Sequence, residues 1–204
     1  MEEPTDTYNT ILKPSPEILF KEKKSKFYGY AFPIQSEDEV KPILDELRKK
    51  HRSAGHVCYA WQLGVEEIHY RANDDGEPNN SAGMPIYGQI QSFDLTNILV
   101  AVARIFGGTK LGVGGLISAY RTTAQMALEA SRIVKKNLEV QLKLTFEYPE
   151  MQKVMRIIKQ NELQIASQEM TTTCELSIIV QKNKVEKVTA MFSTLRQVVL
   201  RFEN

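Results

Sequence analysis

The last third of the chain alternates regularly between apolar strand patterns and helical patterns. The segment EVQLKLTFEY, residues 139–148, alternates apolar and polar residues, which predicts a strand. Pro149 stands where a first helical turn would accept it, and the apolar residues after it recur at helical spacing. The segments ELQIASQEM and CELSIIVQ, a second helix over 185–195 and the segment QVVLRF complete the pattern. The order strand, helix, strand, strand, helix, strand predicts a ferredoxin-like βαββαβ unit.

The first part of the chain shows longer and less regular elements. Residues 17–34, EILFKEKKSKFYGYAFPI, predict a hairpin that turns around Lys24 and Ser25. Ser36 and Glu39 have capping-box spacing and predict a helix that starts near Asp38. The remaining expected elements are buried strands at 56–64 and 97–106, a loop at 72–85 between these strands, and a helix over 115–131.

A shift in composition predicts two domains. All eleven glycines lie at or before Gly115, and the prolines thin out after Pro85. We therefore expect one domain over residues 1–137 and a second over 138–204, and a fold of the α/β (α+β) class.

Composition adds exclusions rather than a function. The 204 residues are 42% hydrophobic and 25% charged with a net charge of +1, so no global attraction to polyanions is expected. No run of about 18 apolar residues occurs and the N-terminus has no basic start, so we expect a cytoplasmic protein without a membrane segment. The two cysteines, Cys58 and Cys174, are far apart in sequence and are expected to be reduced.

A glycine-dense segment precedes the third expected helix. In RIFGGTKLGVGGLISAYR, residues 104–121, five glycines surround Lys110. Backbone N–H groups at a helix N-terminus can bind phosphate, but the spacing matches neither a Walker A loop nor a dinucleotide fingerprint. Two interpretations stay open: an anion-binding loop, or a tight connection between a strand and a helix.

Three other groups of residues could carry chemistry. Asp74, Asp75 and Glu77 could ligate a cation, yet they lack EF-hand spacing and also suit a tight turn, so no metal is expected. His56 lies two residues from Cys58, which is more typical of a buried thiol than of a nucleophile. The lysine run 21–26, which includes Lys24 and Lys26, could bind a nucleic-acid backbone or form a solvated hairpin turn. No motif of a hydrolase or a zinc enzyme occurs, so we expect no catalytic residues and no cofactor.

Three segments together resemble the YigZ/IMPACT family. They are KSKFYGYAFPI, NDDGEPNNSAGMPI and ARIFGGTKLGVGGLISAY, and the resemblance covers about residues 15–131. The chain departs from the family pattern at Val57, Ile105 and Ser118.

The resemblance implies a fold and a role. The first domain would be a ribosomal protein S5 domain 2-like module, and the second would be similar to the last domain of elongation factor G. Because the family includes the eukaryotic translation regulator IMPACT, the resemblance implies a non-enzymatic role in translation through contact with RNA, the ribosome or a translation factor. The S5-like fold also occurs in small-molecule kinases, so a phosphate- or nucleotide-binding enzyme that uses the glycine-rich loop is the alternative.

We expect one functional face, formed where right-handed βαβ connections bring loops to the same end of a sheet. Asp75 or Glu77 should then pair with Arg104 or Lys110. The residues expected at or beside this face are Asp74, Asp75, Gly76, Glu77, Pro78, Arg104, Phe106, Gly107, Gly108, Thr109, Lys110, Gly112, Gly114, Gly115, His56, Lys24 and Lys26.

Overall fold

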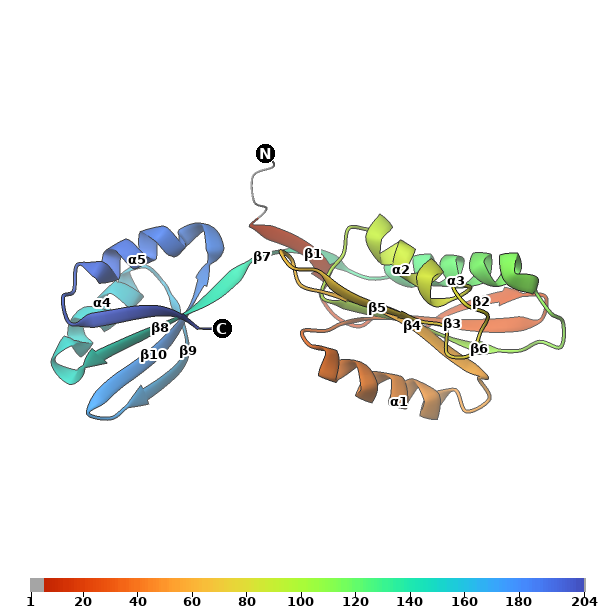
Figure 1. The fold of residues 1–204 in the computed structure, drawn as a ribbon, viewed down its shortest axis with the longest axis horizontal. Helices are drawn as coiled ribbons and strands as arrows, with labels where there is room; N and C mark the ends of the chain where they lie inside the picture. The colour runs from red at the N-terminus through yellow and green to blue at the C-terminus, as the bar shows by residue number, and fades with distance from the viewer. Residues whose placement is uncertain (1–5, 204) are drawn as a thin grey trace. The chain divides into compact units, whose positions relative to one another are not determined.

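Most contacts within the chain fall inside one of two groups of residues. The computed structural model describes residues 6–203. One unit comprises Tyr8–Lys136, and the other contains residues 6–7 and 137–203 of the described chain. Helices and sheets occur in both units, so the chain has a mixed α/β fold with several sheets (Figure 1).

The first unit is built on a five-stranded sheet with the order β2-β3-β6-β4-β5. Neighbouring strands all run antiparallel. The strands are β2 (Ile18–Glu22), β3 (Ser25–Pro33), β4 (His56–Leu63), β5 (His69–Asn73) and β6 (Ile98–Ile105). The central strand β6 is buried along nearly its whole length because helices cover both faces of the sheet.

Helices form a layer on each face of this sheet. Helix α1 (Val40–Lys50) covers one face, while α2 (Gly83–Ser92) and α3 (Gly112–Glu129) cover the other (Figure 1). Alternate residues of β4 supply the two cores: Trp61 joins the α1 side, and Cys58 joins the α2 and α3 side.

The starts of two elements follow from their sequence signals. The hairpin formed by β2 and β3 turns at Lys23 and Lys24, because Glu22 pairs directly with Ser25. A short 3-10 turn, Glu37–Glu39, precedes α1, and the capping box of Ser36 with Glu39 is formed. The hairpin and the capping box are therefore confirmed, and the turn lies one residue earlier than expected.

Several expected boundaries in the first unit are wrong. The segment 72–85 is not all loop, because β5 ends in it and α2 begins in it. The sequence did not predict helix α2, because GMPIYGQIQS contains two glycines and a proline. Helices tolerate these residues only when packing stabilises the helix. Helix α3 begins at Gly112 rather than at 115, so only Leu111 separates it from Lys110. Strands β1 (Thr7–Ile11) and β7 (Ile133–Asn137), which pair in a separate sheet, were also not expected.

The second unit has the expected order of elements. Its sheet has the strand order β11-β8-β10-β9, and all three neighbouring pairs are antiparallel. Buried side chains of β8 and β10 pack with those of both helices in one core. The elements are β8 (Glu139–Glu147), α4 (Met151–Gln160), β9 (Gln164–Met170), β10 (Thr173–Gln181), α5 (Val185–Ser193) and β11 (Val198–Glu203).

No helix within residues 6–203 is both long enough and apolar enough to cross a membrane.

We predict that fragments 1–137 and 138–204 each fold alone, since each contains its own apolar core. Trp61 is the only tryptophan and lies in the first unit, so its fluorescence follows only that unit. Fragment 1–137 should melt cooperatively with the fluorescence midpoint of the full chain. Fragment 138–204 should show a cooperative melt by circular dichroism, and a non-cooperative melt of either fragment would contradict the boundary.

Candidate functional site

Strand pairing, rather than a βαβ connection, brings the candidate segments together. In the register of β4 with β6, His56 lies opposite Arg104. In the register of β3 with β6, Lys26 lies opposite Ile105. The end of β6 therefore lies between the start of β4 and the β2–β3 hairpin, which carries Lys24 and Lys26. The expected neighbourhood is formed, but the expected parallel topology was the wrong reason for it, because these strands are antiparallel.

We call Asp74, Asp75 and Glu77 the acidic block. A buried ion pair joins this block to β6. Nη1 of Arg104 lies 2.6 Å from Oε1 of Glu77, and the two side chains are only 8% and 4% exposed. The hydroxyl of Tyr120 on α3 donates a second hydrogen bond, 2.8 Å long, to the same carboxylate oxygen. This is one of the pairings that the sequence predicted. It connects the loop after β5, the central strand and α3.

The other two acids of the block hold the backbone. Asp74 accepts hydrogen bonds from the N–H groups of Asn80, Ala82 and Gly83, and so caps the start of α2. Asp75 accepts from the N–H of Val57 and pairs with Arg48 at 3.1 Å. The expected pairing of Asp75 or Glu77 with Arg104 or Lys110 is therefore made by Glu77, whereas Asp75 pairs with Arg48.

No cluster of three or more His, Cys, Asp or Glu side chains suited to a metal ion occurs within residues 6–203. Gly76 has a φ of +87° and lies close to the His56 ring. That ring is held in turn by a 2.7 Å hydrogen bond from Nδ1 to the carbonyl oxygen of Asp75.

The Cys58 thiol has a structural role inside the core. Its sulfur lies 3.0 Å from the carbonyl oxygen of Asp74 and 3.3 Å from the hydroxyl oxygen of Tyr120, and its single S–H can donate to either of these acceptors. Burial raises the pKa of the Cys58 thiol well above its usual value, and burial likewise raises the pKa of Tyr120. A thiol held in its protonated form is a poor nucleophile.

Two glycines of the loop have identifiable structural tasks. A Cβ on Gly107 would lie 2.0 Å from the backbone carbon of Lys24, so only glycine fits against the hairpin turn. Its N–H also donates to the Ser25 hydroxyl at 3.1 Å. Gly112 has a φ of +73° where α3 begins, a conformation that favours glycine. The tight-connection interpretation of the loop therefore holds at these two positions.

A pocket of about 410 Å³, which we call the loop pocket, lies beside the ion pair. Its lining is mostly apolar, with the Arg104–Glu77 pair in its wall and Lys110 at the start of α3. The lining residues are Gly55, His56, Glu77, Pro78, Arg104, Phe106, Lys110, Leu111, Gly112, Val113 and Leu116.

Seven of the expected site residues line this pocket. Those that do not are Asp74, Asp75, Gly76, Gly107, Gly108, Thr109, Gly114, Gly115, Lys24 and Lys26. Leu111 and Val113 were missed because α3 starts three residues earlier than expected, which turns a presumed loop segment into the pocket wall. No apolar repeat signals this earlier start, because the position one turn after Leu111 is Gly115, which has no side chain.

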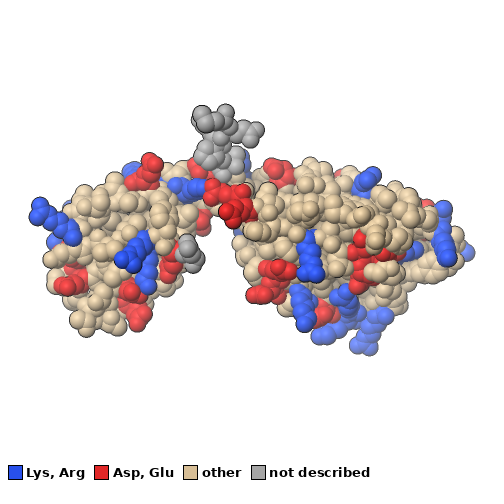
Figure 2. All heavy atoms as spheres, viewed as in Figure 1, with Lys and Arg blue, Asp and Glu red and all other residues tan. Residues whose placement is uncertain are grey.

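A smaller pocket of about 180 Å³, which we call the arginine pocket, shares Gly55 and His56 with the loop pocket. It lies at the C-terminal end of α1, whose last turn holds three basic residues. Figure 2 shows Lys and Arg side chains gathered over α1. The lining residues are Arg48, His51, Arg52, Ala54, Gly55, His56, Val57 and Asp75.

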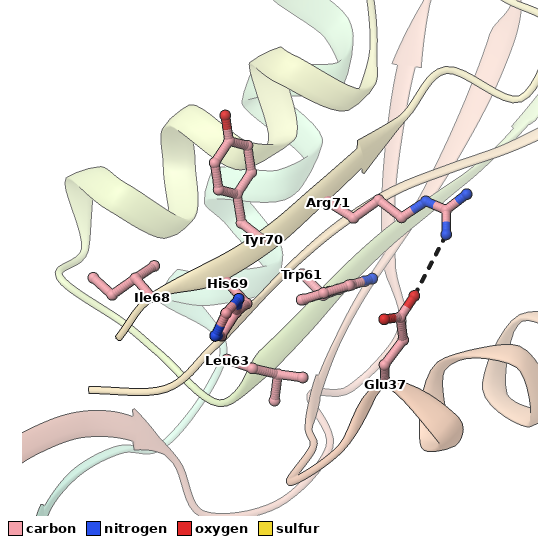
Figure 3. Close-up of a pocket in the computed structure, with 7 residues that line it drawn as sticks. All are labelled: Glu37, Trp61, Leu63, Ile68, His69, Tyr70 and Arg71. Atoms are coloured by element: carbon pink, nitrogen blue, oxygen red, sulfur yellow. Dashed lines mark hydrogen bonds and ion pairs between the residues drawn. The ribbon is translucent and has the colours of Figure 1, made fainter. Parts of the chain in front are cut away.

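A third hollow, of about 770 Å³, lies along the edge strand β5 (Figure 3). The Trp61 and His69 side chains lie beneath the strand, while Tyr70 points to the other face and stacks on Tyr87. Arg71 forms an exposed ion pair with Glu37 at 3.4 Å. No expected site residue lines this hollow, and its arginine is already paired, so the loop pocket is the better candidate site.

The chain belongs to the IMPACT family. The model of the Impact N-terminal domain matches residues 23–128, more than half of the chain. A family member from Thermus thermophilus is 34% identical over 142 residues, which cover 70% of this chain and 76% of the relative. YvyE of Bacillus subtilis is 29% identical over 84% of this chain and 77% of its own length. A Saccharomyces cerevisiae IMPACT homolog is 32% identical over 53% of this chain and 42% of its own.

One solved structure shows the same architecture over almost the whole chain. A crystal structure of a hypothetical protein aligns over 98% of both chains with a TM-score of 0.77 and 23% identity, so the two chains share a fold. A structure described as that of the two-domain translational regulator Yih1 aligns over 58% of this chain and 46% of its own, at 28% identity and a TM-score of 0.39.

We predict that Glu77→Gln lowers the free energy of unfolding by about 3 kcal/mol or more, because it leaves the Arg104 guanidinium buried without a counter-charge. The matched control is Glu37→Gln, which breaks a pair whose side chains are 57% and 59% exposed and should cost less than about 1 kcal/mol. Denaturant titration followed by Trp61 fluorescence measures both variants. Equal losses in the two variants would contradict the structural importance of the buried pair.

Proposed function

We propose that this chain is a non-enzymatic binding module that regulates translation, and that the surface around the loop pocket contacts RNA of the translation machinery. Membership of the IMPACT family supports the role in translation. The observation that carries the RNA contact is a set of exposed lysines without ion pairs on two adjoining loops, one of which also carries an exposed aromatic ring.

The cations at this end of the sheet are free to meet a ligand. The side chains of Lys24, Lys26 and Lys110 are exposed, and within residues 6–203 none of them has an ion pair. Gly107 packs directly on the backbone of Lys24, so the hairpin turn lies against the glycine-rich loop. Phe106, the residue before Gly107, is 55% exposed, and the Arg104 guanidinium lies 5.6 Å from the centre of its ring. Single-stranded RNA is typically bound by lysines and an aromatic ring. The lysines neutralise phosphates, and the ring stacks on bases.

The hairpin turn is strained in a way that points to function. Lys23 and Lys24 have φ values of +42° and +68°, in a two-residue turn where Asn-Gly is the favoured pair. A left-handed conformation costs a side-chain-bearing residue about 1–2 kcal/mol. Strain of this kind is often retained where the residues serve a ligand. Here the retained property is the positive charge of two adjacent lysines.

We also propose the finer fold assignment and the setting. The antiparallel sheet covered by α1 on one face and by α2 and α3 on the other would be an S5 domain 2-like module over residues 1–137. The sheet order β11-β8-β10-β9 supports a ferredoxin-like domain over 138–204, similar to the last domain of elongation factor G. A role on the ribosome places the protein in the cytoplasm.

We predict that the protein co-sediments with ribosomes and dissociates as salt rises, because phosphate contacts release counterions. Lys110→Ala should lower the slope of log affinity against log salt by about 0.7–0.9, the share of one phosphate contact, and leave the melting temperature nearly unchanged. Lys41→Ala, an exposed lysine at the start of α1, is the control and should change neither quantity. Binding that salt does not weaken would point instead to a protein partner such as a translation factor.

The strained turn offers a test in which stability and binding change in opposite directions. The double variant Lys23→Asn with Lys24→Gly should raise the free energy of unfolding by about 1 kcal/mol, because Asn-Gly suits the turn. The same variant should weaken RNA binding and lower the salt slope by up to two phosphate contacts. Thermal melts and RNA titrations at two salt concentrations measure both effects. A stabilised variant that binds RNA as the parent does would show that the lysines serve no ligand.

The alternative function is an enzyme that binds a nucleotide at the glycine-rich loop. The feature that favours it is the N-terminus of α3 in the wall of the loop pocket, directly after Lys110. A phosphoryl-transfer enzyme also needs a base or a metal ligand, and the nearby acids hold the backbone or pair with arginines. Turnover of ATP or GTP that is lost in Lys110→Ala would favour this alternative over the binding module.

A further inference from the structure

The loop pocket and the arginine pocket adjoin at Gly55 and His56, which line both, and we call the two pockets together the groove. The two halves differ in chemistry. Together their volumes of about 410 and 180 Å³ lie in the range of about 300–1,000 Å³ that small-molecule sites occupy. A ligand that fills both must have an apolar end and a polar end.

The loop-pocket half suits a flat ring. Phe106 and Val113 stand at its rim with exposed fractions of 55% and 53%, and Leu111 and Leu116 are buried beside them. Aromatic side chains exposed next to cations are favourable surfaces for a nucleobase.

A buried donor in the same wall has no acceptor. Arg104 lines the loop pocket, and its Nε has no hydrogen-bond partner among the described residues. Most buried donors in folded proteins are satisfied, so such an exception needs an explanation. A ligand in the loop pocket would lie beside the guanidinium that carries this unpaired donor.

The arginine-pocket half suits an anion. Both carboxylate oxygens of Asp75 are engaged, one by Arg48 and the other by the N–H of Val57, so this acid does not offer a free charge to the pocket. Arg52 is exposed and has no ion pair within residues 6–203. Because Nδ1 of His56 is bonded to the carbonyl of Asp75, only its Nε2 remains for a ligand.

We infer that this groove binds one 5′-phosphorylated nucleotide, with its base against Phe106 and its phosphate at Arg52 and His56. The nucleotide is either free or an unpaired nucleotide of an RNA strand. The inference rests on the proposed function, because it names the unit of RNA that the surface around the loop pocket would hold.

The test is calorimetric titration of the full chain with AMP, adenosine, inorganic phosphate and a 5′-phosphorylated hexa-adenylate RNA. If the nucleotide is free, AMP should bind at least about tenfold more tightly than adenosine or phosphate, since it uses both halves. If it belongs to RNA, the hexa-adenylate should bind while AMP does not. In either case Arg52→Ala should weaken binding about tenfold, the share of one charge-assisted hydrogen bond.

Matched variants separate the two halves. Phe106→Ala should weaken AMP and hexa-adenylate about tenfold through lost stacking, but should not change the binding of phosphate. Arg71→Ala, an exposed arginine in the hollow along β5, is the control and should leave both ligands unaffected. Phe106 and Arg52 are exposed, and thermal melts verify that their variants stay folded.

The inference is overturned if neither AMP nor hexa-adenylate responds to Arg52→Ala and Phe106→Ala. If ribosome co-sedimentation still depends on Lys110 in that case, the nucleotide groove is wrong and the proposed function survives. If co-sedimentation is also absent or independent of Lys110, both proposals fail.

Discussion

The ion pair between Glu77 and Arg104 is the interaction on which the arrangement of the first unit depends. Glu77 comes from the loop after β5, Arg104 from the end of the central strand, and Tyr120 of α3 donates to the same carboxylate. Two buried charges are tolerated only when each has its partner, so these three segments must be placed together. The loop pocket lies beside this pair and shares its two residues, so the shape of the pocket depends on the pair.

The acidic block shows how far sequence reasoning could go. Three acids within four residues predicted a tight turn. The pairing of Glu77 with Arg104 was among the expected contacts. The distribution of tasks was not predictable, because it depends on the backbone around each acid. Asp74 caps α2, a helix that its weakly periodic sequence did not predict. Asp75 pairs with Arg48, a residue of α1 that is distant in the sequence. Long-range pairing of this kind leaves no local pattern.

The periodicity of apolar residues predicted the elements best where each helix or strand buries only one face. The second unit has strongly alternating strands and amphipathic helices, and its order of elements could be read directly. In the first unit, the start of α3 was placed too late because glycines at 112, 114 and 115 weaken the helical signal. Packing and the positive φ of Gly112 decide where that helix begins, and neither is visible in residue spacing.

The contact of Gly107 with the hairpin makes the lysine-bearing surface rigid. Two backbone segments that touch without an intervening side chain have no rotamers through which to shift. The backbones that carry the lysines of the turn and Phe106 are therefore held at a fixed separation before any ligand arrives. A preorganised surface loses little conformational entropy on binding. For the proposed RNA contact, a backbone held in this way favours ligands whose charges and rings match the spacing of the hairpin turn and the glycine-rich loop.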